Sequence, residues 1–533
     1  MAKDRDHKER GGGGGCGGEK KMLVGVIWNC AAELKLLLAT LLILCSVATL
    51  LQFLPSRFTI SPSDLRLCLS KVSTTTTTNA ISNDNNFSPL LQAPAPLLQA
   101  PAPSVPNAAP PPPPQPDVEH ERILNNSVLK RAFNAYGAAA YNFITMGAYR
   151  GGPNTFAVVG LSSKPLHVFG KPAYECEWVP RNNPEGSTFA SWTYKILPDW
   201  GYGRVYTVVV VNCTFSDPIN VDNTGGSLFI HASTSGGGDT RFNLTDRILS
   251  LEEQPDSVDF SIFLPSSKPK YDYLYCGSSL YGSLSPQRMR EWLAYHVRLL
   301  GAKSHFVIHD AGGVHEEVLE VLKPWMELGY VTLQDIRDQE RFDGYYHNQF
   351  LVVNDCLHRY KHMAKWMFFF DVDEYIYVPS KQTIRSVLDS LSGFTQFTIE
   401  QNPMSSQLCL QDDYGKAHRR WGFEKLVYKD VKRGIRRDRK YAIQPRNVFA
   451  TGVHMSMNLL GKTNHKTSDK MKYFHYHGTI ARRTEPCRNY VNWTRYNFEN
   501  QPYVMDTTLR STGLAVRKFE VSMIGSRLEN TRQ

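Results

Sequence analysis

The chain has 533 residues, of which 60 are Lys or Arg and 50 are Asp or Glu, so its formal net charge is +10. With 42% hydrophobic and 21% charged residues the composition excludes a mainly disordered protein, and the length predicts roughly two or three domains. Ten cysteines in a chain of this length exclude a small disulfide scaffold. The positive charge does not distinguish nucleic acid, a membrane and an anionic polymer as partners.

The first 118 residues divide into three stretches of different composition. Residues 1–35 are polar and are expected to form a cytosolic tail. Leu36–Leu54 carries no charge and would span about 28 Å as a helix, close to the thickness of a bilayer's hydrocarbon core, which predicts a single transmembrane signal anchor. A cleaved signal peptide is the alternative, although its apolar region is normally only about 7–15 residues long. Residues 55–118 are rich in Pro and Thr and are expected to form a disordered, extended stem.

Features beyond the stem indicate that the rest of the chain lies in an oxidising lumen. Asn-x-Ser/Thr sequons, the acceptor pattern for N-glycosylation, begin at Asn125, Asn212, Asn243 and Asn492. Six cysteines there permit disulfides, and Cys176 and Cys213 are the expected pair because both lie in one strand-rich region. Cys68 in the stem could form an intermolecular bridge, which would make a homodimer. The layout predicts a single-pass type II membrane protein of the secretory pathway, for which nucleic acid is not an expected partner.

Residues 119–265 are predicted to form a β-rich accessory domain. Segments rich in β-branched and aromatic residues, such as RVYTVVVVNCTF and SLFIHAS, are separated by Gly, Pro and Asn. Strands at this spacing are typical of a β-sandwich. Four aromatic residues could form a platform for sugar rings, with a place in the core as the alternative: Trp178, Trp192, Trp200 and Tyr202.

Residues 266–533 are predicted to form an α/β domain, because strand and helix patterns alternate along its first half. The clearest helix is Pro286–Leu300, with Ser285 as its N-cap and Gly301 as its C-terminal stop. Strands are expected at 271–277, 305–310, 330–336 and 366–370, and further helices at 315–329 and 346–363. This order favours an open, largely parallel sheet, which binds its ligands beyond the carboxyl ends of the strands.

The most specific feature is a pair of aspartates at the end of a strand. Trp366–Phe370 is apolar throughout, and Asp371, Asp373 and Glu374 follow at once. Carboxylates are rarely buried unless they pair or bind metal. Asp371 and Asp373 are therefore predicted to hold Mn²⁺ (or Mg²⁺), which would neutralise a departing nucleotide diphosphate. The alternatives are a solvated turn and a phosphohydrolase, the latter disfavoured because Tyr375 stands where that pattern has Thr or Val.

Three segments resemble glycosyltransferase family 92: FFFDVDEYIYVP, the upstream HNQFLVVNDCLHRYKHMAKW and the downstream RRWGFEKLVY. With the anchor, the stem and the strand-rich region, the chain is similar to the plant galactan β-1,4-galactosyltransferases of that family. The resemblance implies a GT-A-type nucleotide-sugar transferase fold, UDP-galactose as donor, Mn²⁺ dependence and inversion at the anomeric carbon. It also implies a carbohydrate-binding-like accessory domain, pectic galactan of rhamnogalacturonan I as acceptor, a role in cell wall biogenesis, and a Golgi membrane location with a luminal catalytic domain.

The resemblance also indicates residues that contact the donor. Cys276–Tyr281 follow the first strand of the α/β region, where this type of fold places the nucleotide base and ribose, and Asp310 ends the second strand. Asn354 and Asp355 lie on the helix before the aspartate pair and could contact the donor as well. Helix capping or packing is the alternative role for each of these residues.

An inverting transfer needs a carboxylate that takes the proton of the acceptor hydroxyl. Glu424 is the preferred candidate, because its WGFE segment is similar to the Trp-Gly-rich acidic acceptor segment of other inverting galactosyltransferases. Asp412 and Asp413 are the alternatives.

A downstream histidine often completes the metal site in folds of this type. His477 is the preferred candidate, with His454 and His475 as alternatives. The basic run Lys429–Lys440 is expected to be a solvated face or a contact for an anionic pectic acceptor. Two other functions stay open: a transferase with another donor such as UDP-arabinopyranose, and a non-catalytic polysaccharide-binding protein.

Overall fold

The computed structural model describes residues 118–137, 141–234, 245–345, 347–434 and 438–532. All of them belong to one of the two units into which the chain divides, Pro112–Gln533. The predicted tail, the predicted anchor and, except for Val118, the predicted stem lie outside the described residues. Within the described ranges, no helix is long and apolar enough to cross a membrane.

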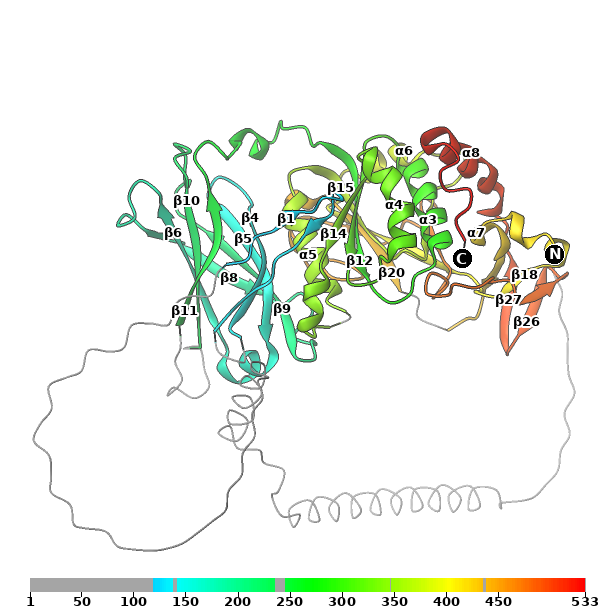
Figure 1. Cartoon of the computed structure of the whole chain (residues 1–533), viewed down its shortest axis with the longest axis horizontal. Coiled ribbons are helices and arrows are strands. Elements are labelled where there is room, and N and C mark those ends of the chain that lie inside the picture. The colour runs from blue at the N-terminus through cyan, green and yellow to red at the C-terminus, as the bar shows by residue number, and fades with distance from the viewer. Residues whose placement is uncertain (1–117, 138–140, 235–244, 346, 435–437, 533) are drawn as a thin grey trace, which may run out of the picture. The chain divides into compact units, whose positions relative to one another are not determined.

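Two antiparallel sheets make up the first part of this unit (Figure 1). One has the order β3-β4-β5-β9-β8, and its strands are Asn134–Tyr136, Phe143–Arg150, Thr155–Ser163, Tyr206–Thr214 and Trp192–Ile196. The other has the order β11-β10-β6-β7, and its strands are Thr245–Glu253, Gly226–Ser233, Ala173–Pro180 and Thr188–Phe189. A hydrophobic core includes residues of both sheets, and the expected disulfide Cys176–Cys213, which the structure confirms, joins β6 to β9.

The sequence of β9 explains how this region is attached to the rest of the unit. Val209 and Val211 belong to the core that both antiparallel sheets share, whereas Val208 and Val210 belong to a second core that includes α/β residues. Successive side chains of a strand point to opposite faces, so four valines in a row suit a strand that is covered on both sides. The first sheet therefore packs directly against the α/β part.

The largest sheet begins with parallel strands in the order β2-β14-β13-β12-β15. These strands are Leu129–Lys130, Val331–Asp335, Ser304–Asp310, Tyr271–Leu280 and Ala364–Phe369, and β1 (Arg122–Ile123) pairs with β2 at the edge. Beyond β15 the sheet continues as β20-β17-β24-β16, with β23 on β17; these are Arg439–Ile443, Gln396–Pro403, Lys472–His475, Glu374–Tyr377 and Thr463–Asn464. The prediction of a largely parallel sheet is right up to β15. Beyond β15 the sheet is mixed, because β20 runs antiparallel to both of its neighbours, β15 and β17, and β16 runs antiparallel to β24. The strands β17, β24 and β23 are parallel to one another.

Helices pack on both sides of this sheet (Figure 1). α3 is Pro286–Leu300, as predicted: the Ser285 side chain accepts a hydrogen bond from the first turn, and Gly301 ends the helix with a φ of 81°. α3 and α4 (Glu316–Glu327) share one hydrophobic core with the sheet. α5 (Gln349–Tyr360) belongs to the core that includes β9. It therefore lies between the largest sheet and the antiparallel sheet β3-β4-β5-β9-β8.

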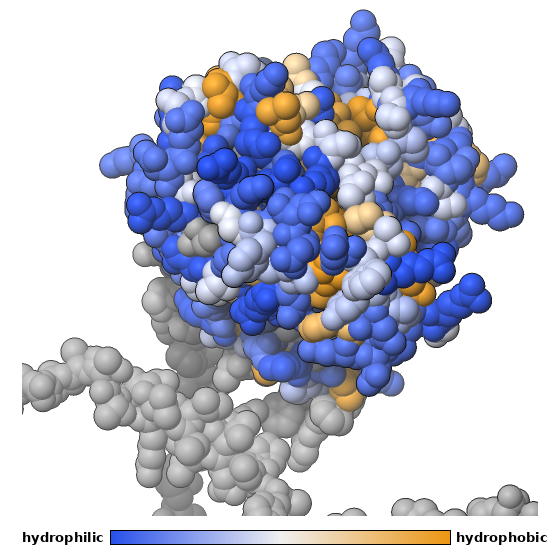
Figure 2. Space-filling model, turned by 90° about the vertical axis from the view of Figure 1, so that its right-hand side faces the viewer, coloured by the Kyte–Doolittle hydropathy of each residue, from blue (hydrophilic) through white to orange (hydrophobic). Residues whose placement is uncertain are grey.

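Shorter elements complete the unit. The helices are α6 (Ile384–Ser390), α7 (Gly422–Lys425) and α8 (Gly513–Ile524). The strands are β18 (Leu408–Leu410), β19 (Tyr428–Asp430), β21 (Val448–Ala450), β22 (Asn458–Leu459), β25 (Asn489–Val491), β26 (Arg495–Phe498) and β27 (Gln501–Met505). The short helical turns are η1 (Leu166–Gly170), η3 (Phe260–Phe263), η4 (Arg337–Arg341), η5 (Gln411–Asp413), η6 (Ala417–Arg419), η7 (Pro445–Asn447) and η8 (Arg510–Thr512). Figure 2 shows that one face of the molecule is mostly hydrophilic, with hydrophobic residues in small groups.

Candidate functional site

The aspartate pair lies where the chain leaves β15 and before it enters β16. Gln349 Nε2, at the start of α5, donates to Oδ1 of Asp371 at 3.3 Å, and Lys440 Nζ on β20 lies 2.7 Å from its Oδ2. The Ser278 side chain, on β12, hydrogen-bonds to the same carboxylate. Burial alone would raise the pKa of Asp371, but the charge of Lys440 and these hydrogen bonds hold the pKa below its usual value. Lys440 of β20 and Ser278 of β12 therefore favour the ionised form of Asp371, and Gln349 of α5 adds a third hydrogen bond to its carboxylate.

Lys440 serves as counter-ion to two carboxylates. Its Nζ also lies 3.6 Å from Oε2 of Glu374, and its side chain is 3% exposed. The same Glu374 oxygen accepts the backbone N–H of Asp371 at 2.7 Å, so Glu374 fixes the turn that carries the pair. Burial raises the pKa of Glu374 to about 7, although Lys440 opposes the shift. Burial would lower the pKa of Lys440, but Asp371 and Glu374 raise it, so the ammonium group stays charged.

Asp373 faces β24 instead. Its Oδ2 accepts the backbone N–H of Gly478 at 2.8 Å, and its Oδ1 lies 3.5 Å from Nε2 of His475. The antiparallel register of β16 and β24 places His475 opposite Glu374, which brings the imidazole to the pair. Burial would lower the pKa of His475, yet Asp373 and Glu374 raise it. His477 is exposed, with its ring 5.1 Å from that of His475, so His475 is the histidine in direct reach of Asp373.

The donor set of this site fits a divalent cation only together with a diphosphate. Among the residues that the structure describes, no three His, Cys, Asp or Glu side chains form a metal cluster. Asp373 and His475 offer one oxygen and one nitrogen, and cations that act on phosphates commonly take only one or two carboxylates from the protein. The amide of Gln401 lies 2.6 Å from Nδ1 of His475 and can accept its proton in one amide orientation, which leaves Nε2 free for an ion. Asp371, by contrast, already has a cationic partner in Lys440.

A cavity of about 210 Å³ opens at the carboxyl ends of the parallel strands. Tyr281, directly after β12, lines this cavity, and its ring stacks on that of His347 with a centroid separation of 3.8 Å. Asp310 ends β13, and its Oδ1 accepts the N–H groups of Gly312 and Val314 at 2.9 and 3.0 Å. Burial raises the pKa of Asp310. The structure thus brings Tyr281 and Asp310 to the same sheet edge, with Tyr281 in the cavity wall and Asp310 holding the adjoining loop.

Three residues that were predicted to contact the donor are buried and have structural roles. Cys276 is fully buried inside β12, which runs on to Leu280, and its sulfur is bonded to Cys356. Asn354 is fully buried and hydrogen-bonds to backbone groups of α5 and of the segment after β21. Asp355 is fully buried in an ion pair with Arg131. The structure thus agrees with the packing role that was the alternative for these residues. The disulfide closes off Cys276 inside β12, and Asn354 and Asp355 lie on α5, which is covered by a sheet on each side.

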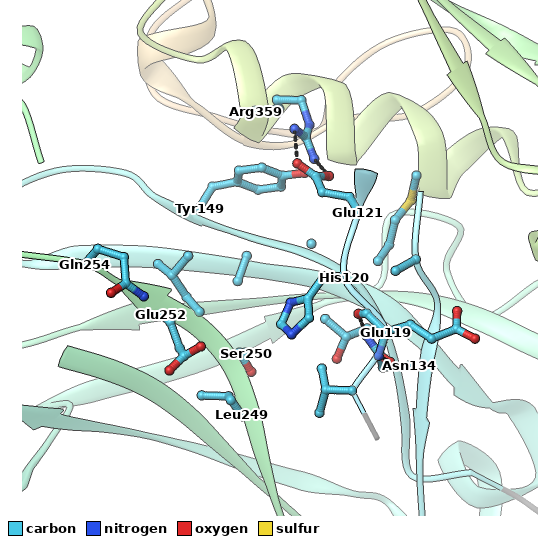
Figure 3. A pocket seen from close by; sticks show the side chains of 17 residues that line it. Glu119, His120, Glu121, Asn134, Tyr149, Leu249, Ser250, Glu252, Gln254 and Arg359 are labelled. Atoms are coloured by element: carbon cyan, nitrogen blue, oxygen red, sulfur yellow. Dashed lines mark hydrogen bonds and ion pairs between the residues drawn. The ribbon is translucent and has the colours of Figure 1, made fainter. Parts of the chain in front are cut away.

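Asp355 anchors an ion network at the junction of α5 and the first antiparallel sheet. Arg131 donates to its two oxygens at 2.6 and 2.8 Å. Burial would raise the pKa of Asp355, but Arg131 holds it at about 2. Figure 3 shows Arg359 of α5 paired with Glu121 beside a cavity of about 510 Å³, which His120 also lines. This cavity is larger than the one at the strand ends but shares no lining residue with it, so size alone does not mark the site.

The three candidate bases differ in how firmly they are held. Glu424 is 1% exposed, accepts a backbone N–H at the start of α7 and pairs with Arg517. Asp413 accepts from Arg510 at 2.8 Å and is buried. Asp412 is exposed and forms no ion pair within the described part of the chain. Among the three candidates, Asp412 is the one that is exposed and outside the ion pairs of the described residues.

Two residues that were named for a surface role are buried, and for Trp178 this is the place in the core that was given as the alternative. Trp178 is 2% exposed and stacks on Phe156 in the sandwich core, because it occupies an inward position of β6, so it is no sugar platform. Asn212 is 7% exposed within the paired strand β9, which makes its sequon inaccessible in the folded chain. Asn125 and Asn492 are exposed, and Asn243 lies outside the described residues.

Sequence reasoning missed three residues that contact the aspartate pair or its neighbours. Lys440 ends the basic run that was expected to be a solvated face or a contact for the acceptor, Gln349 was not singled out, and Ser278 was covered only as part of the segment Cys276–Tyr281 and not as a contact of Asp371. The signal for Lys440 was the apolar YAI that follows it, which marks the start of a buried strand rather than a loop. No sequence signal distinguishes Gln349 or Ser278 from ordinary polar residues.

Comparisons with known proteins give consistent results. The model of glycosyltransferase family 92 matches residues 271–512. Galactan β-1,4-galactosyltransferase GALS3 of Arabidopsis thaliana is 58% identical over 522 residues, which cover 97% of this chain and 98% of that protein. Galactan β-1,4-galactosyltransferase GALS2 of the same plant is 58% identical over 538 residues and 100% of both chains. The structure of galactosyltransferase LgtC in complex with donor and acceptor sugar analogs aligns with 33% of this chain and with 58% of its own chain. The sequence identity is 10% and the TM-score is 0.18, so this similarity supports no conclusion about the fold or the site.

Proposed function

Because the chain belongs to glycosyltransferase family 92, we propose that it transfers galactose from UDP-galactose to a β-1,4-galactan, with inversion at the anomeric carbon. The family prediction made from three sequence segments is confirmed by the family match and by relatives that align over almost the whole chain. The observation that carries the activity is the name that both full-length relatives share, galactan β-1,4-galactosyltransferase.

The arrangement of the site supports a GT-A-type catalytic domain at 266–533. Its parallel strands carry a cavity at their carboxyl ends, where open α/β sheets bind ligands. Uracil would enter this cavity beside Tyr281 and His347, whose flat rings offer a stacking surface. The diphosphate would then lie toward Asp371 and Asp373, since Gln349 joins the segment that lines the cavity to the carboxylate of Asp371.

Each residue of the aspartate pair has its own task in this proposal. Lys440 holds Asp371 ionised and oriented, so that Asp371 can accept hydrogen bonds from the donor. Asp373 and His475 would hold Mn²⁺ or Mg²⁺, and that ion would supply charge neutralisation for the departing diphosphate. Asp412, whose carboxylate is exposed, would take the proton of the acceptor hydroxyl.

The remaining parts of the proposal concern where the enzyme works. Residues 119–265 would form a β-sandwich accessory domain that binds carbohydrate. The apolar segment 36–54 would anchor the protein in the Golgi membrane as a type II protein, with 55–118 as a stem. The pectic galactan of rhamnogalacturonan I would be the acceptor, and Cys68 could link two copies.

A donor screen tests this function. The purified protein is incubated with β-1,4-galacto-oligosaccharides and one UDP-sugar at a time, with and without Mn²⁺, and the products are resolved by mass. We expect extension by galactose from UDP-galactose and its loss in Asp373→Ala. A preference for UDP-arabinopyranose would show that UDP-galactose is not the main donor. Oligosaccharide binding without UDP release would contradict an enzymatic role.

A further inference from the structure

An exposed aromatic path runs along the boundary between the accessory sheet and the α/β part. Trp200, Tyr202 and Tyr345 are 65%, 64% and 38% exposed. Ring centroids are 6.2 Å apart for Trp200 and Tyr202, and 6.3 Å apart for Tyr202 and Tyr345. The first two rings lie in the loop between β8 and β9, and the third lies just before α5. Two parts of the chain that are far apart in sequence thus build one aromatic surface.

The loop that carries the first two rings is fixed. Asp199 is fully buried beneath it and accepts hydrogen bonds from Gly201 N–H at 3.1 Å, the Thr207 hydroxyl at 2.7 Å and Val208 N–H at 3.2 Å. Trp200 has a φ of 50°, a conformation that bulky residues rarely adopt. The fold therefore keeps the Trp200 side chain exposed to solvent and accepts a strained backbone at this position. Packing does not require this arrangement, because the exposed ring fills no space in the core.

The same loop is bound to the segment that leads to the candidate site. The N–H groups of Val205 and Tyr206 both donate to the carbonyl of Asp343, at 3.2 and 3.1 Å. Asp343 and the following Gly344 line the cavity at the strand ends, together with His347. Two residues beyond His347, Gln349 contacts Asp371. The loop of the aromatic path is therefore joined by hydrogen bonds to the segment that lines the proposed donor cavity, and the same segment leads to Gln349 and the aspartate pair.

We propose that Trp200, Tyr202 and Tyr345 form the subsite for the galactan acceptor chain behind its reacting end. This inference rests on the proposed function, because a polymerising transferase must hold acceptor residues beyond the one that reacts. One face of a galactopyranose ring carries mostly C–H groups and stacks on aromatic rings, and ring spacings near 6 Å are on the scale of one sugar unit. Arg204 and Asp343, an ion pair at 3.7 Å beside the rings, offer polar groups for the sugar hydroxyls.

A second copy of the chain fits this surface less well. An aromatic side chain covers about 200 Å² when buried, so the exposed parts of three rings leave only about 300 Å² to be covered. A stable protein interface buries about 800 Å² on each partner. A flexible neutral glycan needs no such area, because each of its sugar units can contribute binding energy by stacking on one aromatic ring.

The test is the double variant Trp200→Gly/Tyr202→Ala, assayed with β-1,4-galacto-oligosaccharides of increasing length. Glycine adopts the φ of position 200 without strain, so the loop is preserved. We expect KM for long acceptors to rise roughly tenfold, from the loss of two stacking contacts, while KM for UDP-galactose and kcat stay unchanged. The effect should vanish for the shortest acceptor, which does not reach the rings. Trp493→Ala, which removes a 70% exposed tryptophan elsewhere, is the matched control and should leave every constant unchanged.

Several outcomes would overturn the inference. The acceptor KM could be equal in the wild type and the double variant at every length, or Trp493→Ala could have the same effect. A change in oligomeric state on analytical ultracentrifugation with an unchanged KM would make the rings a contact between copies. Calorimetry in an Asp373→Ala background separates the two proposals, because oligosaccharide binding that depends on Trp200 and Tyr202 supports the subsite even if the wild type transfers no galactose. Binding that survives their loss contradicts it.

Discussion

Replacing Lys440 by methionine should move the acid limb of the activity profile. Lys440 Nζ lies 2.7 Å from Asp371, where the Coulomb energy of two unit charges is about 6 kcal/mol at an effective dielectric constant of 20. The Asp371 side chain is 28% exposed, so solvent and the surrounding hydrogen bonds absorb much of this energy. We expect a net shift of about one to two pH units, or roughly 1.4–2.8 kcal/mol.

The direction of this shift follows from the charges. Lys440 holds the pKa of Asp371 below its usual value, so the wild type keeps this carboxylate ionised in mild acid. Without Lys440 the pKa rises, and the ionised form is lost at a higher pH. The profile of kcat/KM against pH should therefore fall off earlier as the solution is acidified.

A matched lysine provides the control. Lys361 is also buried, donates to the carbonyl of Val448 at 2.8 Å and has a pKa that burial lowers to about 8. Lys361→Met should reduce stability but leave the acid limb in place. An acid limb that does not move in folded Lys440→Met would refute the idea that Lys440 keeps Asp371 ionised.

Three further predictions follow from the described contacts. Arg131→Met leaves the fully buried Asp355 without its partner and should lower the free energy of unfolding by about 3–5 kcal/mol in denaturant titration. In the wild type, the depressed pKa of Asp355, about 2, contributes about 2 kcal/mol to the free energy of unfolding above pH 3.8, and this contribution is lost as the pH falls through 2. Asp412→Asn should lower kcat at least a hundredfold while Glu424→Gln lowers the melting temperature with little change in kcat, and the reverse pattern would return the base to Glu424. Replacing both Cys276 and Cys356 by serine opens a cross-link between residues 80 apart and should cost about 4 kcal/mol of stability with an unchanged KM for UDP-galactose, whereas a raised KM would restore Cys276 to the donor site.

The sequence was sufficient where local patterns decide the structure. Ser285, Pro286 and Gly301 define both ends of α3, and the apolar run before Asp371 defines β15. The pair Cys176–Cys213 followed from its place in one strand-rich region. These features depend on capping, on side-chain alternation and on proximity in the chain, all of which a single sequence contains.

The sequence alone was insufficient to place residues whose surroundings depend on pairing between strands that are distant in the chain. Lys440 reads as part of a charged surface until β20 is placed between β15 and β17, where it is buried beside Asp371. His475 rather than His477 reaches Asp373 because of the register between β16 and β24. Asp355 looks available on an isolated helix, but the accessory sheet covers the side of α5 that carries it. No periodicity within one segment contains this information.

The claim on which the account depends is that the sheet edge with Asp371, Asp373 and the Tyr281 cavity binds the donor diphosphate. A crystal structure of the protein with UDP and Mn²⁺ tests it most directly. We predict uracil beside Tyr281, the diphosphate at the aspartate pair and an ion in contact with Asp373 and His475. Nucleotide bound elsewhere, with both aspartates facing only protein and water, would contradict the account.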